Sequence, residues 1–296
     1  MPIQMLNLQP LTLNELPLLR EYLYKYPRET CDYNLCNLMT WGKIYRNHYT
    51  IWRNHLVLVN PKYAYIFYPV GPGLSSADLR ELLDLYRCQE PEAELILIPG
   101  NWRVKHPDLE DYFVVREERD WEDYVYSVEK MVNLSGKKLA KKKNLISQFS
   151  RAYPDYRVLP LTADKHGVVL RFTEKWKRER NAEGIYLNTE LQAIRNTLEM
   201  WEDLPVEGLI ICHHNLISAY SVFSRQTEDM ATIHFEKFDP DMKGSAQIIN
   251  WETAKSLQSN YLWVNREQDM GLEGLRQAKM TYLPERMLKF VLGTPR

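Results

Sequence analysis

The feature that most constrains this chain is an order of predicted elements that occurs twice. In the first half, hydrophobic periodicity and turn residues predict two helices, three strands, a helix, a strand, a helix and a strand. The predicted ranges are helices 13–25 and 34–41, strands 49–52, 56–59 and 64–68, helix 76–87, strand 94–98, a helix in the stretch up to 118, and strand 124–128.

The second half repeats this order after a basic helix and one additional strand. Its predicted ranges are helix 136–150, strand 156–159, helices 163–180 and 188–200, strands 208–213, 216–223 and 231–238, helix 245–257, strand 261–264, helix 272–279 and strand 286–291. A repeated order indicates an internal duplication, and 296 residues exceed the usual size of one domain. We therefore predict two α/β domains, 1–132 and 133–296.

Composition excludes several classes of protein. The content of apolar (45%) and charged (26%) residues is that of an ordinary folded domain, and a net charge of −1 does not suit a polycation. No apolar run is long enough to span a bilayer, and the first residues lack a basic region followed by an apolar core, which predicts a cytoplasmic protein. The four cysteines form no Cys-x-x-Cys pair, and His213-His214 falls at a predicted hairpin, so no metal site is expected.

One turn is suited to an anionic ligand. The strand TIHFEKF (232–238) leads through DMKGSA (241–246) into a helix. Small residues at a helix N-terminus let backbone amides approach a pyrophosphate, and the helix dipole favours negative charge. Lys243 adds a positive charge, whereas Asp241 would repel phosphate if it pointed inward. A purely structural glycine at this turn is the alternative.

This order of elements and this turn resemble the GNAT superfamily of acyl-CoA-dependent N-acyltransferases, whose turn is usually written Gln/Arg-x-x-Gly-x-Gly/Ala. Gly244 and Ala246 match that pattern, while Asp241 departs from it. The resemblance implies coenzyme A or acyl-CoA as ligand, bound by the following residues of the turn: Lys243, Gly244, Ser245 and Ala246.

A second resemblance covers the whole second half. The segments GKKLAKKKNLISQF (136–149), IHFEK (233–237), VNREQD (264–269) and GLEGLRQAKMTYLP (271–284) are similar to the C-terminal catalytic domain of phosphatidylglycerol lysyltransferases. That family and the Fem-type aminoacyltransferases carry two GNAT-like domains. The resemblance implies two tandem domains, each a mixed, mostly antiparallel sheet flanked by helices, with a degenerate N-terminal copy.

The basic segment 136–151 contains six cationic side chains and no acidic one. A solvated helix face is the simple interpretation, but such faces usually mix signs. We therefore expect an anionic partner, with CoA phosphates, a tRNA acceptor stem or a lipid headgroup as candidates. The residues predicted to contact it are Lys137, Lys138, Lys141, Lys142 and Lys143.

Polar residues follow a predicted buried strand abruptly at 265–269, where ligands bind in α/β folds. Arg266 could hold a phosphate or carboxylate bidentately, and Arg276 lies on the following helix. Asp269 is a candidate for binding the acceptor, with helix capping as the alternative. By resemblance to Fem-type enzymes, Lys279 is the candidate cation for the oxyanion, with an exposed structural lysine as the alternative.

Acyl transfer to an amine needs a base near the reacting carbonyl. Glu236 is predicted to lie beside the turn on strand 231–238, and His234 shares its face. We rank Glu236 first as the base and Tyr282 as a general acid. His234 as a core residue and Tyr282 as packing before Pro284 are the alternatives.

The sequence thus predicts an acyl- or aminoacyl-transferase that uses acyl-CoA or aminoacyl-tRNA as donor and a small amine, peptide or lipid-headgroup acceptor. CoA is preferred over tRNA because the net charge is slightly negative and the Gly244 turn suits a pyrophosphate. The competing hypothesis is an inactive module of the same fold that binds CoA, RNA or an anionic lipid.

Overall fold

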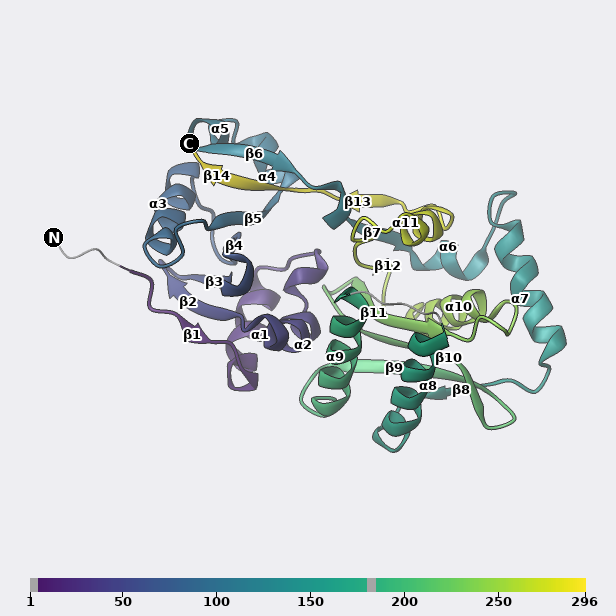
Figure 1. The fold of residues 1–296 in the computed structure, drawn as a ribbon. Coiled ribbons are helices and arrows are strands. Elements are labelled where there is room, and N and C mark those ends of the chain that lie inside the picture. Colours follow the sequence, from purple (N-terminus) through teal and green to yellow (C-terminus); the bar gives the residue numbers. More distant parts are fainter. Residues whose placement is uncertain (1–4, 180–184) are drawn as a thin grey trace. The chain divides into compact units, whose positions relative to one another are not determined.

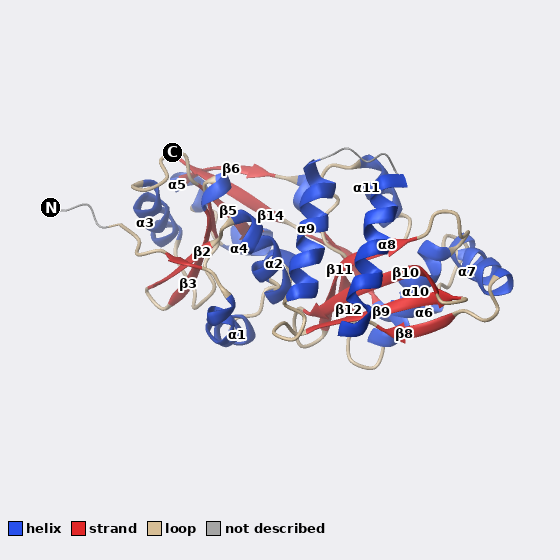
Figure 2. Ribbon diagram, turned by 60° about the horizontal axis from the view of Figure 1, so that its bottom comes forward, coloured by secondary structure: helices blue, strands red, loops and turns tan. Residues whose placement is uncertain are grey.

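The computed structural model of the chain describes residues 5–179 and 185–296. It contains two seven-stranded mixed sheets with helices packed against them (Figure 1, Figure 2). The chain divides into two compact units: unit 1 comprises Met1–Arg28, Asn37–Glu122 and Leu288–Arg296, and unit 2 comprises Glu29–Cys36 and Asp123–Met287. These units are interleaved in sequence, so this division differs from a single cut between residues 132 and 133.

The unit 1 sheet has the strand order β1-β2-β3-β4-β5-β14-β6. Its strands are β1 (Gln9–Pro10), β2 (His48–Trp52), β3 (His55–Asn60), β4 (Tyr65–Phe67), β5 (Glu94–Pro99), β6 (Phe113–Glu117) and β14 (Phe290–Pro295). Strands β4 and β5 pair in parallel, and the other neighbours pair antiparallel. The helices of this part of the chain are α1 (Leu16–Lys25), α2 (Leu35–Tyr45), α3 (Ser76–Arg87), α4 (Gly100–Lys105) and α5 (Leu109–Tyr112).

The unit 2 sheet has the order β13-β7-β12-β11-β10-β9-β8. Its strands are β7 (Asp123–Ser127), β8 (Arg157–Pro160), β9 (Val206–His213), β10 (Leu216–Arg225), β11 (Met230–Phe238), β12 (Trp263–Asn265) and β13 (Arg286–Leu288). Strands β11 and β12 pair in parallel. The helices are α6 (Val128–Asn133), α7 (Ala140–Ala152), α8 (His166–Glu179), α9 (Ile185–Glu199), α10 (Ser245–Leu257) and α11 (Glu273–Met280).

The two sheets show the predicted duplication, and they exchange one strand. Read from β1 and from β8, both sheets place five consecutive strands first, with the fourth and fifth in parallel. The sixth place in the unit 1 sheet is taken by β14, from the C-terminal end of the chain. The sixth place in the unit 2 sheet is taken by β7, which follows the first copy in sequence. Each sheet is therefore completed by the other half of the chain.

Side chains alternate between the two faces of the unit 2 sheet, and both faces carry helices. Glu236 on β11 accepts a hydrogen bond from Asn250 of α10, whereas the next residue, Lys237, donates to Glu190 of α9 at 2.7 Å. Because successive side chains of a strand point to opposite faces, α10 and α9 cover opposite faces of this sheet. The α10 face is packed by Ile248 and other apolar residues of α7, β9 and β10.

Local chemistry explains several boundaries. Ser75 caps α3 in a capping box with Asp78, and Leu79, Leu82 and Leu83 of that helix enter the unit 1 core. Helix α7 begins at Ala140, not at residue 136. The preceding residues form a turn in which Gly136 takes a φ of +92°, a conformation that favours glycine.

Two predicted elements are wrong in detail. The stretch up to residue 118 contains two short helices but ends in strand β6, which the sequence analysis missed. The predicted strand 286–291 is two strands, β13 in one sheet and the start of β14 in the other. The end of the predicted helix 163–180 reaches Arg180, which lies outside the described residues.

Among the described residues, no helix combines the length and apolar character needed to cross a membrane. In the same part of the chain, no cluster of three or more histidine, cysteine, aspartate or glutamate side chains is arranged to hold a metal ion.

Candidate functional site

The candidate site lies where the parallel pair of unit 2 opens. Strands β11 and β12 pair over three residues, and the last pair is Thr232 with Asn265. Strand β11 continues past this point, while the chain leaves β12. Glu236 and Arg266 meet across the opening, and Arg266 Nη2 donates to Glu236 Oε1 at 3.1 Å. Their side chains are 12% and 13% exposed, so this is a buried ion pair.

Three buried polar atoms near this ion pair have no hydrogen-bond partner among the described residues. They are Glu236 Oε2, Asn250 Oδ1 and the hydroxyl oxygen of Tyr282. Asn250 also donates to the other oxygen of Glu236 through its Nδ2. Since buried polar groups in native proteins are nearly always paired, such a group of atoms marks a place where a polar ligand is expected.

Burial controls the protonation of the acid–base candidates. Burial raises the pKa of Glu236, and the Arg266 guanidinium and the Asn250 amide oppose this rise. Burial also raises the pKa of Tyr282, against the opposing effect of Arg266. The phenol is therefore protonated at neutral pH and can donate a proton, while the carboxylate is a stronger base than an exposed one.

Helix α7 contributes one lysine to this site. Lys142 Nζ donates to Thr281 Oγ1 at 2.8 Å and lies 4.3 Å from the centroid of the Tyr282 ring. Burial lowers the pKa of Lys142, and the neighbouring Arg266 and Lys141 lower it further. The other predicted anion-binding lysines are exposed: Lys137, Lys138, Lys141 and Lys143.

Lys279 holds the loop that follows β12. Its ammonium donates to the backbone carbonyl oxygens of Arg266 at 2.6 Å, Glu267 at 3.1 Å and Gln268 at 2.5 Å. Burial lowers the pKa of Lys279 to about 8, and the charge of Arg266 contributes to this lowering. All three donors of the ammonium are thus engaged, so the predicted contact with an oxyanion would require this clamp to open.

Asp269 and Arg276 are bound to each other. Arg276 Nε and Nη2 each donate to the carboxylate at 2.8 Å, and the hydroxyl of Tyr124 and the amide of Gly271 donate to it as well. Burial alone would raise the pKa of Asp269, but these hydrogen bonds lower it to about 2. The pair braces the loop against α11. Its predicted roles in acceptor and cofactor binding stay predictions.

The turn before α10 packs against α7. Gly244 has a φ of +92°, and a Cβ at this position would lie 2.4 Å from the carbonyl oxygen of Leu145. Ser245 is buried, its amide donates to Met242 O at 3.0 Å, and its hydroxyl donates to Asp239 O at 2.6 Å. Lys243 is exposed and Ala246 is partly buried. The turn thus has a structural reason for its glycine, and CoA binding there stays a prediction.

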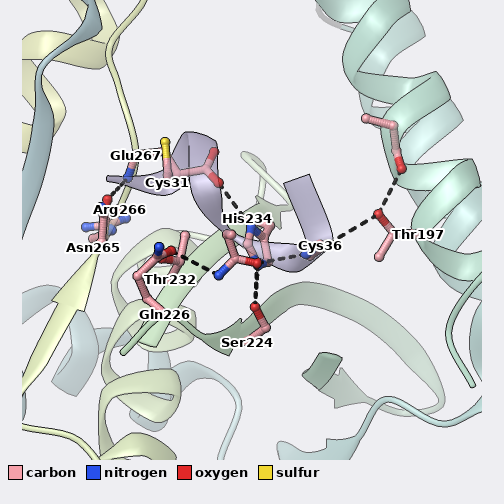
Figure 3. A network of polar contacts seen from close by, with 12 residues as sticks. Cys31, Cys36, Thr197, Ser224, Gln226, Thr232, His234, Asn265, Arg266 and Glu267 are labelled. Atoms are coloured by element: carbon pink, nitrogen blue, oxygen red, sulfur yellow. Dashed lines mark hydrogen bonds and ion pairs between the residues drawn. The ribbon is translucent and has the colours of Figure 1, made fainter. Parts of the chain in front are cut away.

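A second polar network is centred on His234 and includes Glu267 of the loop that follows β12 (Figure 3). His234 Nε2 contacts Ser224 Oγ at 2.8 Å, and Nδ1 contacts Glu267 Oε1 at 3.0 Å. Asn34 Nδ2 donates to Gln226, which identifies the other side-chain atom of Asn34 as the acceptor oxygen Oδ1. The Ser224 hydroxyl donates to this Asn34 Oδ1 at 3.0 Å. With that proton committed, Nε2 of His234 must donate to Ser224.

The histidine is therefore an imidazolium. Burial alone would lower the pKa of His234, but its interactions with Cys36 and Glu267 raise it to about 10. A serine, histidine and glutamate in this order resemble a hydrolytic triad, but here the serine proton and both ring nitrogens are committed. His234 is accordingly a buried fixed charge, and Glu236 is the stronger candidate for the base.

Sequence reasoning missed the carboxylates next to this network. Asp123 is fully buried and accepts from the Cys31 amide and from Asn265 Nδ2, both at 2.7 Å. Burial raises the pKa of Asp123, and burial together with the nearby Asp123 charge raises that of Asp32 to about 7. Only the position of Asp123 in the sequence could have indicated its role, because Asp123 begins strand β7 and Asn265 ends the adjacent strand β12.

The structure therefore brings Glu236, Arg266, Tyr282 and Lys142 together at the opening of the parallel pair. It places Lys279, Asp269 and Arg276 in the clamp of the adjoining loop. Two mixed sheets with the same strand order, each with a parallel pair at the same place, give this chain a tandem GNAT/Fem-like fold.

Residues 24–293 match the family model described as "Phosphatidylglycerol lysyltransferase, C-terminal", and the chain belongs to this family. A conserved protein of unknown function from Bacteroides thetaiotaomicron has 28% identity and a TM-score of 0.91, covering 99% of this chain and 100% of that one. The L-PGS from Bacillus licheniformis has 12% identity and a TM-score of 0.64, covering 95% of this chain and 91% of that one. FemX has 8% identity and a TM-score of 0.59, covering 96% of each chain.

The L-PGS and FemX matches, at such low identity, establish the fold alone. An uncharacterised protein of Mycoplasmoides gallisepticum is 23% identical over 168 residues, which are 56% of this chain. The match spans 54% of that relative, about half of its length.

Proposed function

We propose that this protein is an aminoacyltransferase that moves an aminoacyl group from aminoacyl-tRNA to a hydroxyl or amine of an acceptor. The observation that carries the proposal is the buried Glu236–Arg266 pair, together with a carboxylate oxygen of Glu236 and the nearby hydroxyl of Tyr282, neither of which has a hydrogen-bond partner in the described part of the chain. Membership of the family and the likeness of the fold support the reaction class.

The proposed chemistry uses these groups in a balanced proton transfer. Glu236 accepts the proton of the acceptor hydroxyl or amine as its oxygen or nitrogen attacks the ester carbonyl. Arg266 offsets the negative charge that develops in the site, and Tyr282 protonates the leaving ribose oxygen. The proton taken up by Glu236 then returns to the Tyr282 phenolate, which restores both groups.

Two observations favour aminoacyl-tRNA over acyl-CoA as the donor. Four exposed lysines lie on or just before α7, and Lys142 of the same helix contacts Tyr282 at the candidate site. A polyanion bound by these lysines would therefore lie close to Glu236. The Gly244 turn, which made CoA attractive from the sequence, is closed against Leu145 of α7. Acyl-CoA remains the second candidate donor because α10 starts at that turn.

The test uses the full chain with lysyl-tRNA carrying labelled lysine, and with phosphatidylglycerol vesicles, glycerol and free amines as acceptors. Label should appear in an acceptor, and Glu236→Gln should slow its appearance by about 10²- to 10⁴-fold, the usual contribution of a general base. Binding of the charged tRNA should be unchanged in this variant, because in the proposed mechanism Glu236 contacts only the reacting group and not the rest of the tRNA.

Controls separate the donors and the competing hypothesis. Lys138→Glu with Lys141→Glu should weaken tRNA binding, whereas Lys175→Glu, at an exposed lysine of α8, should not. Thiol release from acetyl-CoA that Glu236→Gln abolishes would replace tRNA by CoA as the donor carrier. Binding of tRNA without transfer from any of the twenty aminoacyl-tRNAs would sink the enzymatic proposal and leave a binding module.

A further inference from the structure

A long segment of the chain, most of it in unit 1, contains no acidic residue. No aspartate or glutamate occurs in the 45 residues between Asp32 and Asp78, although the whole chain has 39 in 296. Nine of these 45 residues are aromatic, against 12% of the whole chain, and four are lysine or arginine. Aromatic residues interleaved with basic ones are typical of a surface that binds nucleic acid.

Five aromatic side chains of unit 1 form a continuous series of ring contacts, here called the aromatic stripe: Trp41, Tyr45, Tyr63, Tyr65 and Trp121. In this order, successive ring centroids lie 6.1, 5.5, 6.0 and 5.7 Å apart. Tyr63 is 49% exposed, and the other four side chains are partly exposed. Aromatic rings that stay in contact with solvent can still stack on a ligand, so the stripe is a candidate binding surface.

One end of the aromatic stripe is cationic. Lys62 Nζ lies 5.3 Å from the ring centroids of both Tyr45 and Tyr63. Lys62 is exposed, and so are Lys43 near the end of α2 and Arg46 just after it. This end therefore combines ring faces with positive charges, which is the combination that a strand of nucleotides requires.

The other end of the aromatic stripe is less suited to an anion. Tyr65 begins β4 and pairs with Glu94 of β5. Glu94 and Glu118 both contact Arg116, at 3.4 and 2.7 Å, so the positive charge of this arginine is already matched. A polyanion is therefore expected at Tyr45 and Tyr63.

We propose that the aromatic stripe binds single-stranded nucleic acid, with bases stacked on Tyr45 and Tyr63 and phosphates beside Lys62. Every base has a face that can stack on an aromatic ring, whereas a duplex keeps its bases stacked on one another. Charge complementarity selects this occupant over a proline-rich peptide, which would use the exposed rings without needing the cations. The inference goes beyond the proposed transfer activity, because the bound strand need not carry an aminoacyl group.

The experiment measures the fluorescence anisotropy of a labelled RNA strand of about twelve nucleotides, within the usual range of site sizes, as the full chain is added. We expect tighter binding of the single strand than of the same strand in a duplex. Tyr63→Leu should weaken binding by about fivefold or more, because the stacking of one base is lost. Lys62→Gln should reduce the slope of log affinity against log salt concentration by about 0.7, the value for one phosphate contact on a single strand.

Matched controls are available within unit 1. Tyr24 on α1 is 50% exposed, almost the same as Tyr63, and Tyr24→Leu should leave the affinity unchanged. Lys105→Gln, at an exposed lysine of α4, should leave the salt slope unchanged. Circular dichroism should show that all four variants are folded, since the substituted side chains are exposed.

Two further arms separate this surface from the proposed donor site and identify the source of the strand. Lys138→Glu with Lys141→Glu, which should weaken tRNA binding, should leave binding of the short strand unchanged. Intact tRNA is then compared with tRNA whose unpaired 3′ end has been removed. An affinity that falls on removal, with a loss that Tyr63→Leu does not increase, supports the proposal with the tRNA end as the strand; equal affinities, with the short strand still bound, support it with another RNA.

The inference is overturned by any of three results. Equal affinity for the duplex and the single strand would mean that the attraction is electrostatic alone. An affinity that Tyr63→Leu lowers no more than Tyr24→Leu would show that the stripe makes no stacking contact. The third result is binding of a proline-rich peptide in the absence of binding to any single strand.

Discussion

The charge on His234 can be tested through the pH dependence of stability. The perturbation is His234→Gln, which keeps a polar side chain of similar size but cannot titrate. The hydrogen bonds with Ser224 and Glu267 require a doubly protonated ring in the folded state. In the unfolded chain the ring has its ordinary pKa near 6.5, and in the folded protein the pKa is raised to about 10.

The sign and size of the effect follow from these two values. A raised pKa means that the folded state holds its proton more tightly, so the stabilisation is fully present below pH 6.5 and is lost as the pH rises toward 10. Each unit of pKa difference corresponds to about 1.4 kcal/mol. The unchanged protein should have a larger free energy of unfolding than His234→Gln at pH 6.5. This difference should fall by roughly 2 kcal/mol between pH 6.5 and pH 8.5.

The assay is urea unfolding of both proteins at intervals across that pH range, with the difference taken at each pH. Taking the difference removes other titrations, including that of Lys279, whose lowered pKa makes stability rise with pH above about 8. Nitrogen-detected NMR of the His234 ring at pH 8.5 should show an imidazolium. A difference that stays constant with pH, together with a neutral ring in the NMR spectrum, would refute the assignment of the protons.

Three other predictions concern the loop clamp and the turn. Gly244→Ala should lower the free energy of unfolding by about 2 to 4 kcal/mol, because its Cβ would meet Leu145 O and its φ is positive; unchanged urea midpoints would contradict the packing. Lys279→Met should cost roughly 3 kcal/mol or more and increase hydrogen exchange in the loop after β12, since three carbonyls lose their donor; unaltered exchange would oppose the clamp. Asp269, whose pKa is lowered, should contribute about 2 kcal/mol to the free energy of unfolding above pH 4, and this contribution should be lost as the pH falls toward 2. In acid unfolding, Asp269→Asn should remove this pH dependence. A variant with the same pH profile as the unchanged protein would exclude the Asp269–Arg276 pair as the origin of the dependence.

The sequence predicted which segments form helices and strands better than it predicted their partners. Alternating and periodic apolar residues mark an element, but they carry no information on which sheet it joins. The residues of β13 and β14 follow one another in the stretch RMLKFVL (286–292), with Lys289 alone between them, yet the two strands belong to different sheets. Strand β6 was missed because Phe113, Val114 and Val115 are followed directly by charged residues, which obscures its short pattern.

At the candidate site, the sequence predicted functional groups but not the contacts that they make. Glu236, Arg266 and Tyr282 were predicted as separate candidates, and the opening of the parallel pair brings them together. Lys279 was also predicted, but a lysine pattern cannot distinguish an ammonium aimed at a ligand from one aimed at backbone carbonyls. Asp123 carries no motif, because its importance comes from a neighbour almost a hundred residues earlier, Cys31.

The duplication allows the candidate site in unit 2 to be compared with the corresponding place in unit 1. In unit 2 the last parallel pair is Thr232 with Asn265, and in unit 1 it is Phe67 with Ile96. Counting forward equally from these pairs, the unit 1 counterparts of Glu236 and Arg266 are Gly71 and Leu97. Leu97 is buried, and a Cβ on Gly71 would lie 2.5 Å from the His55 ring.

A charged pair therefore has neither the residues nor the room to form at the corresponding place in unit 1. The duplication kept the strand register, because the parallel pair is needed to build each sheet. The carboxylate and guanidinium occur in one copy alone, and a buried ion pair is costly to desolvate and is a weak source of stability. Its presence in unit 2 is thus better explained by what the opening binds than by the needs of the fold, which unit 1 meets with a leucine and a glycine.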